Sequence, residues 1–256
     1  MIDTLLLTST RLRTFSGSAE LTAATGFFFE RDTRLYLVTN RHTLFDPASS
    51  HEPNRIEIDV HEDADNMADA ATVSIPLYRH GTAKWHQGRD SAGEVDVAVV
   101  ELDPAVLPPA PLIRAFTPAH LALPGPDTTV EIGADLLAVG FPLGFYDTLH
   151  KLPVVRRAML ASAFGLRFQG LGCFLTDART HRGMSGAPIV QRLDTPTSPS
   201  SSPLVAAPST DLPWSLVGIH SSAFDMSTRD TETEDSLGLN QAWYVDILMT
   251  LTEPDA

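Results

Sequence analysis

Short apolar runs separated by glycine, proline and polar turn residues recur along this chain, and they limit it to a fold built from many short strands. Residues 23–30 (AATGFFFE) and 34–39 (RLYLVT) flank a turn-like RDT and predict a β-hairpin. Residues 55–60 (RIEIDV) alternate with a period of two, and residues 95–102 (VDVAVVEL) resemble a strand buried on both faces. The pattern favours an all-β sandwich or barrel architecture.

The rest of the chain continues this pattern. Helical periodicity is scarce, and the best helix candidate is residues 244–251. Further strands are expected at 136–139, 158–163, 172–177, 187–191 and 215–220.

Proline divides the chain into two halves. The proline-rich stretch 103–127 is expected to connect a first domain, residues 1–110, to a second, residues 111–256. The Ser/Pro/Thr-rich stretch 194–213 and the acidic stretch 225–235 are expected to be loops. Residues 61–69 are acidic but lack the glycine and terminal glutamate of an EF-hand, so we expect a solvated loop there.

Composition excludes several classes of partner. The formal net charge of −14 repels phosphates and anionic lipids, so neither nucleic acid nor a membrane surface is an expected partner. The single cysteine, Cys173, leaves no internal disulfide. No secretory leader or membrane-length apolar run is visible, which favours a cytoplasmic location. We expect neither a metal nor a cofactor.

Residues 183–188 (GMSGAP) contain a candidate nucleophile. Acyl transfer needs a nucleophile on a tight turn with backbone N–H groups aimed at the developing oxyanion, and glycines beside Ser185 allow that close approach. The N–H groups of Gly183 and Ser185 would form this oxyanion hole. Such a tetrapeptide also occurs in ordinary loops, so a structural role remains an alternative.

A candidate base and a candidate orienting acid precede this serine. His42 lies just past an apolar strand, where a scaffold can present a side chain rigidly, and the alternative is an ordinary turn histidine. Asp96 heads a deeply apolar strand, where pairing with an imidazole would satisfy its charge. The alternative for Asp96 is a surface cap. The chain order His42, Asp96, Ser185 is that of the chymotrypsin-like arrangement.

Four segments carry a specific resemblance. Residues 39–42 (TNRH), 96–100 (DVAVV), 140–144 (GFPLG) and 183–188 resemble motifs of chymotrypsin-fold, trypsin-like bacterial serine peptidases, a group that includes glutamyl endopeptidases. The resemblance implies two six-stranded antiparallel β-barrels with the active site between them, followed by a C-terminal helix. It also implies a catalytic triad of His42, Asp96 and Ser185. Met184 replaces the aspartate that serves zymogen activation in digestive members, so that switch is not expected.

The resemblance extends to the substrate pocket. Thr180, five residues before the nucleophile, and His220 in the following strand match the residues that bind glutamate or glutamine side chains in glutamyl endopeptidases and picornaviral proteases. Ser221 on the same strand is also expected to bind substrate. Arg179, at the position of the trypsin-like acidic residue, argues against cleavage after Lys or Arg. A buried core histidine remains the alternative for His220.

The sequence therefore predicts a serine endopeptidase that cleaves after Glu, or after Gln. One alternative is a pseudoprotease or partner-activated peptide-binding module with a latent triad. An α/β-hydrolase esterase is a remote alternative, because the Gly-x-Ser-x-Gly motif of those enzymes needs glycine at position 187, where this chain has Ala187. Without a zymogen switch, control by narrow specificity, by a protein partner or by the 194–213 loop is expected.

Overall fold

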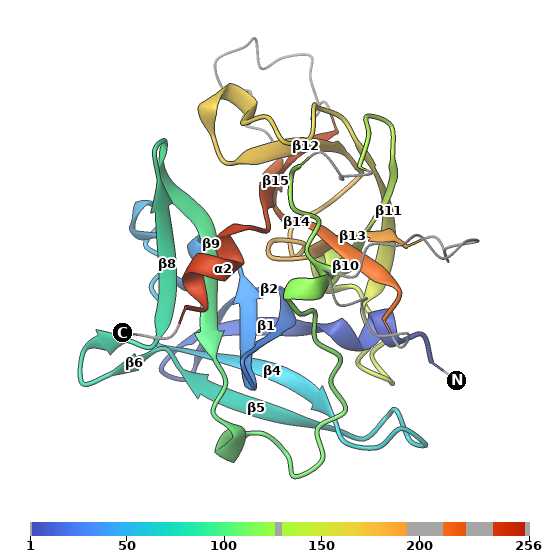
Figure 1. Ribbon diagram of the computed structural model, residues 1–256. Helices are drawn as coiled ribbons and strands as arrows, with labels where there is room; N and C mark the ends of the chain where they lie inside the picture. The colour runs from blue at the N-terminus through green and yellow to red at the C-terminus, as the bar shows by residue number, and fades with distance from the viewer. Residues whose placement is uncertain (1, 126–129, 194–211, 224–237, 254–256) are drawn as a thin grey trace, which may run out of the picture.

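A computed structural model describes residues 2–125, 130–193, 212–223 and 238–253 of the chain (Figure 1). The predicted loop at 225–235 lies outside the described residues, as does the loop at 194–213 except for its last two residues. The described chain is mostly β-structure in two bodies, so the predicted all-β fold is confirmed.

The first half of the chain forms a seven-stranded antiparallel sheet in the order β5-β4-β1-β2-β3-β9-β8. Its strands are β1 (Ser9–Ser16), β2 (Ala19–Arg31), β3 (Arg34–Thr39), β4 (Arg55–His61), β5 (Ala70–Pro76), β8 (Trp85–Asp90) and β9 (Gly93–Glu101). A small separate ribbon pairs β6 (Tyr78–Arg79) with β7 (Thr82–Ala83). The main sheet of this half therefore has one strand more than the six that the resemblance implied.

The second half forms a closed six-stranded barrel, as expected, in the order β10-β11-β12-β15-β14-β13. Its strands are β10 (Asp135–Gly140), β11 (Val154–Leu160), β12 (Cys173–Asp177), β13 (Pro188–Arg192), β14 (Trp214–Ala223) and β15 (Leu239–Tyr244). Figure 1 shows this barrel above and to the right of the first sheet.

Helical segments are short. The α-helices are α1 (Arg41–Leu44) and α2 (Ile247–Leu251), and α2 lies against β8 and β9 (Figure 1). The 3-10 segments are η1 (Thr4–Thr8), η2 (Pro47–Ser49), η3 (Pro104–Val106), η4 (Pro118–His120), η5 (Pro142–Gly144) and η6 (Phe168–Gly170).

The hairpin of β2 and β3 forms where the sequence predicted it. Phe27 pairs with Val38 and Phe29 with Tyr36, so aromatic and β-branched side chains stack across the strands. Asp32 has a positive φ of 51° in the connecting turn, a conformation that aspartate tolerates.

Among the expected boundaries that differ from the structure, two show the physical reason. The C-terminal helix was expected over 244–251 but begins at Ile247, because Tyr244 still pairs with Gly218 as the end of β15. Strand β11 begins at Val154, before the expected 158, since Val154 pairs with Gly140 across the barrel. In both cases a partner strand, rather than local composition, sets the boundary.

One core cluster contains residues of both bodies. Phe27 and Val99 of the first sheet belong to the same buried cluster as Ile219 and Trp243 of the barrel. The proline-rich connector contributes fully buried Phe116, whose N–H donates to Phe28 and whose carbonyl accepts from Glu30. Burial of such side chains stabilises the fold by about 1.5–3 kcal/mol each. The same packing fixes the edge along which the two bodies meet.

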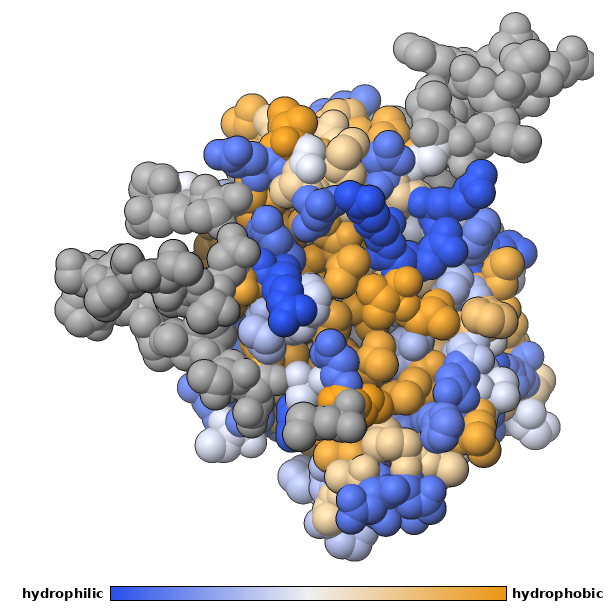
Figure 2. Space-filling view, turned by 90° about the vertical axis from the view of Figure 1, so that its right-hand side faces the viewer, coloured by the Kyte–Doolittle hydropathy of each residue, from blue (hydrophilic) through white to orange (hydrophobic). Residues whose placement is uncertain are grey.

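Some large apolar side chains remain exposed. On the face shown in Figure 2, apolar residues form a band across the middle, with hydrophilic residues beside and above it. The large apolar residues that are exposed include Leu143, Phe145 and Leu149, in the loop that follows β10. This loop begins beside the nucleophile loop, as described below.

Candidate active site

Strand pairing brings His42 and Asp96 to the same place. Thr39, the last residue of β3, pairs with Ala98 of β9, so the chain that follows β3 runs past the start of β9. Between them, the buried side chain of Asn40 donates a 2.7 Å hydrogen bond from Nδ2 to the backbone oxygen of Asp96. The first turn of α1 then presents His42 to the Asp96 carboxylate.

The Asp96 carboxylate receives three hydrogen bonds. His42 Nδ1 lies 2.7 Å from Oδ2, the backbone N–H of His42 donates to Oδ1 at 2.9 Å, and Ser221 Oγ donates to Oδ2 at 2.6 Å. A carboxylate bonded at both oxygens has little freedom to rotate. It therefore holds the ring of His42 with Nδ1 protonated and Nε2 facing away.

Ser185 completes the chain of contacts. Its Oγ lies 3.2 Å from Nε2 of His42 and 3.4 Å from the carbonyl oxygen of Ser221. The structure therefore brings together the three side chains that the sequence order singled out, although 89 and 54 residues separate them along the chain. A hydroxyl at this distance can pass its proton to the imidazole.

Glycine is required on both sides of Ser185. Gly183 has φ +92°, and a Cβ there would lie 2.3 Å from the carbonyl oxygen of Phe141. Gly186 has φ +83°, and a Cβ there would lie 2.3 Å from the carbonyl oxygen of Thr25. The loop can pass between these backbones only without side chains at those two positions.

The nucleophile loop is tied from both bodies. From the first sheet, Thr25 donates its N–H to the carbonyl of Ser185 at 3.0 Å and its hydroxyl to the carbonyl of Gly183 at 2.7 Å. From the barrel, the N–H of Leu143 donates to the carbonyl of Arg182. Since the Arg182–Gly183 peptide is trans, its N–H points opposite to that bonded carbonyl.

The two backbone N–H groups expected to form the oxyanion hole are available. Within the described part of the chain, neither the N–H of Gly183 nor that of Ser185 donates to another group. They flank the Ser185 side chain on a loop whose carbonyls are held by other partners. Two donors held in this way can accept a developing negative charge without rearrangement.

Strand β15 links Thr180, in the loop after β12, to His220 of β14. Thr180 Oγ1 donates to Oδ1 of Asn240 at 2.6 Å, and Asn240 belongs to β15. His220 of β14 pairs with Ala242, so it shares a face with Asn240 two residues along. His220 is only 2% exposed, and its burial, followed by the charge of His42, lowers its pKa to about 4.

The other residues that were considered for substrate contact have different surroundings. The hydroxyl of Ser221, expected to bind substrate, is bonded to Asp96, so only its backbone can face a substrate. The side chains of Arg179, His181 and Arg182 are exposed.

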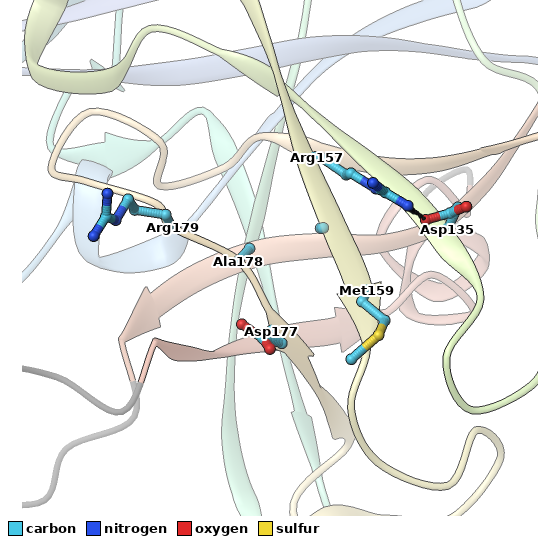
Figure 3. Close-up of a pocket in the computed structure, with 7 residues that line it drawn as sticks. Asp135, Arg157, Met159, Asp177, Ala178 and Arg179 are labelled. Atoms are coloured by element: carbon cyan, nitrogen blue, oxygen red, sulfur yellow. Dashed lines mark hydrogen bonds and ion pairs between the residues drawn. The ribbon is translucent and has the colours of Figure 1, made fainter.

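Arg179 also lines a groove of about 250 Å³ on the outer wall of the barrel, with Asp177 and Met159 among its neighbours. Figure 3 shows the Arg179 side chain pointing away from both. None of His42, Asp96 or Ser185 lines this groove, so it is separate from the site that these three side chains form.

Two residues of the site had no signal in the sequence. Thr25 and Asn240 lie in ordinary strands, and each acts on residues that are distant along the chain. Only the folded pairing identifies them. Among the described residues no cluster of three or more metal-ligating side chains occurs, and no helix is long and apolar enough to cross a membrane.

Comparison with known proteins agrees with this geometry. Residues 24–195 match the trypsin-like peptidase domain. No curated protein matches the sequence. The crystal structure of a serine endoprotease from Yersinia pestis is similar to the chain, with 17% identity, a TM-score of 0.53 and coverage of 97% of this chain. The match covers 62% of that structure, so this chain spans less than two thirds of its length.

A second similar structure is an inactive form of Rv3671c from M. tuberculosis H37Rv, with 15% identity, a TM-score of 0.48 and coverage of 97% of this chain and 89% of that one. At 17% identity, the similarity to the Yersinia pestis structure supports the fold alone. The family match, however, covers more than half of the chain. The chain therefore belongs to the family of trypsin-like peptidases.

Proposed function

We propose that this trypsin-like peptidase is an active serine endopeptidase with Ser185 as nucleophile, His42 as general base and acid, and Asp96 as the group that orients His42. One observation carries the proposal: Ser185 Oγ, the His42 ring and the Asp96 carboxylate form a continuous chain of contacts at 3.2 Å and 2.7 Å. This is the geometry that acyl transfer by a serine requires.

The reaction would proceed in two halves. Ser185 Oγ attacks the carbonyl carbon of the peptide bond while Nε2 of His42 takes its proton, and the resulting imidazolium returns that proton to the leaving amine. In the second half, a water molecule attacks the acyl-enzyme while Nε2 of His42 takes its proton, and His42 then returns that proton to Ser185 Oγ. Asp96 stays ionised and stabilises the imidazolium through Nδ1–H.

The backbone N–H groups of Gly183 and Ser185 would stabilise the tetrahedral oxyanion. Their carbonyl neighbours are bonded to Thr25 and Leu143, which supports a hole formed before substrate binds. Such donors contribute about 2.7–4 kcal/mol each to transition-state stabilisation.

The two bodies would supply different parts of the active site. We propose residues 1–110 as the domain that supplies base and acid, and residues 111–256 as the domain that supplies nucleophile and substrate pocket. The substrate would be a protein or peptide chain lying between them. The location of the protein in the cytoplasm, and its control by a partner, remain predictions.

For specificity we propose cleavage after a residue with a Glu or Gln side chain. Thr180 and His220 are the matching residues of this sequence. Thr180 is bonded to Asn240, and His220 shares a strand face with Asn240, which supports a joint role.

The test is covalent labelling of the purified protein with a fluorophosphonate probe, mapped by mass spectrometry. We expect one equivalent of label on Ser185, and none in the Ser185→Ala variant or in heat-denatured protein. Ser74→Ala is the matched control, since Ser74 is an exposed serine on the edge strand β5, away from the site, and its loss should leave labelling unchanged. If the native protein carries no label on Ser185, the proposal fails, and the latent peptide-binding module becomes the better interpretation.

A further inference from the structure

We infer that Asn240 makes this pocket select a carboxamide, so that the enzyme cleaves after Gln in preference to Glu. The inference rests on the proposed function and concerns the direction of hydrogen bonds at Thr180. Asn240 lies in β15, is 3% exposed and makes three side-chain hydrogen bonds.

The orientation of the Asn240 amide is determined by its surroundings. Its Nδ2 donates to the carbonyl oxygen of Ala178 at 2.7 Å and to that of Gly238 at 3.0 Å. The reversed amide would place an oxygen against two carbonyl oxygens, which have no proton to give. The oxygen Oδ1 must therefore face Thr180.

The hydroxyl proton of Thr180 is consequently already used. A threonine hydroxyl has one proton, and the 2.6 Å contact directs it to Oδ1 of Asn240. Only lone pairs on Thr180 Oγ1 remain for a ligand. Toward substrate, Thr180 is an acceptor.

His220 supplies the opposite group. Its Nδ1 is buried and, within the described residues, has no hydrogen-bond partner. A protonated Nδ1 would be a buried donor without an acceptor, so the neutral ring carries its proton on Nε2. His220 thus offers one donor and no charge.

One donor beside one acceptor complements a primary carboxamide. The carbonyl oxygen of a Gln side chain can accept from His220 Nε2, while its NH₂ donates to Thr180 Oγ1. A Glu carboxylate has no proton for Thr180 and would be desolvated beside a neutral ring, since the nearby Arg179 and Arg182 side chains are exposed. A site with an unpaired polar group discriminates strongly between such isosteres.

The test compares two peptides that differ only in Gln or Glu before the cleaved bond. With the wild-type enzyme at pH 7.5 we expect kcat/KM at least tenfold higher for the Gln peptide. In Thr180→Val, which keeps the shape but removes the acceptor, we expect that ratio to fall at least fivefold. Thr180→Ser keeps the hydroxyl and should retain the preference. Thermal unfolding of each variant verifies that it is folded.

Asn240→Ala gives an independent measurement. It frees the Thr180 proton for a carboxylate, so the Gln-to-Glu ratio should fall because the Glu peptide improves. Equal or faster cleavage of the Glu peptide by wild-type enzyme overturns the inference and leaves the proposed peptidase intact. An unchanged ratio in Thr180→Val also overturns it. No cleavage of either peptide, with no labelling of Ser185, overturns both.

Discussion

The hydroxyl of Thr25 donates a 2.7 Å hydrogen bond to the carbonyl oxygen of Gly183, so a side chain of the first sheet holds the backbone of the loop that carries Ser185. Thr25 is fully buried, and its hydroxyl also accepts from the N–H of Phe141 at 3.2 Å. The loop and the segment after β10 thus share one anchor.

Replacing Thr25 by Val should lower kcat about tenfold with little change in KM, because the N–H of Gly183 loses its fixed direction toward the oxyanion. Steady-state kinetics on a peptide substrate would measure both constants. Thr25→Ser retains the hydroxyl and should recover most of kcat. Wild-type kcat in Thr25→Val would show that the anchor has no part in catalysis.

Asp96→Asn should reduce kcat by about 10⁴, because an amide at this position favours the wrong tautomer of His42. Fluorophosphonate labelling of Ser185 should slow in parallel, since it needs the same base. Asp90→Asn, at the turn of the β8–β9 hairpin, is a control that should retain activity, because the Asp90 carboxylate pairs with Arg167 and not with His42. Labelling at the wild-type rate in Asp96→Asn would separate Asp96 from the catalytic chain.

Ser221→Ala removes one of the three hydrogen bonds to Asp96. A hydrogen bond to a charged group contributes about 1.5–3 kcal/mol, so kcat should fall roughly tenfold or more while the protein remains folded. Ser221→Thr keeps the donor and is the matched comparison. Unchanged kinetics in Ser221→Ala would restore the earlier view of Ser221 as a substrate contact only.

Gly186→Ala should destabilise the protein by about 3 kcal/mol or more, because the new Cβ would lie 2.3 Å from the Thr25 carbonyl oxygen. Gly17→Ala is the matched control: Gly17 also has positive φ, at +58°, but nothing lies within 4 Å of its Cβ position. That variant should lose only about 1 kcal/mol. Urea unfolding would measure both, and equal losses would contradict the close approach.

Stability should depend on pH through His220. Its folded pKa of about 4 lies below the ordinary value of 6.5, so between these values the unfolded chain binds the extra proton. Stability is therefore lost as pH falls from 6.5 toward 4. Between pH 7.5 and 5 this residue should account for about 2 kcal/mol. Urea unfolding of wild type and His220→Leu at both pH values isolates the effect, and parallel losses would contradict it.

The sequence predicted the three side chains that meet in the candidate site better than it predicted their surroundings. Short motifs carry His42, Asp96 and Ser185, because a base after a strand, an acid heading a buried strand and a serine between glycines are local patterns. The hairpin of β2 and β3 was predicted for the same reason. Strand β11 was expected to start four residues late, since its first residues are held by β10 across the barrel.

Contacts between distant segments could not be predicted. Ser221 was assigned to the substrate, but its hydroxyl meets Asp96, 125 residues away. Thr25 and Asn240 were not singled out, because their environment exists only when strands from separate parts of the chain pair. Hydrogen-bond direction is likewise a property of the folded neighbourhood and not of residue type.

Because Thr25 anchors the loop that carries Ser185, the parts of the site can form only in a fixed order. While the chain is being synthesised, His42 and Asp96 emerge before the segment with Ser185, and Ser185 gains its anchored loop only after the barrel docks on the sheet that carries Thr25. A nascent chain therefore contains His42 and Asp96 before it contains Ser185. The contacts that hold the Ser185 loop form last, once both bodies are present and docked.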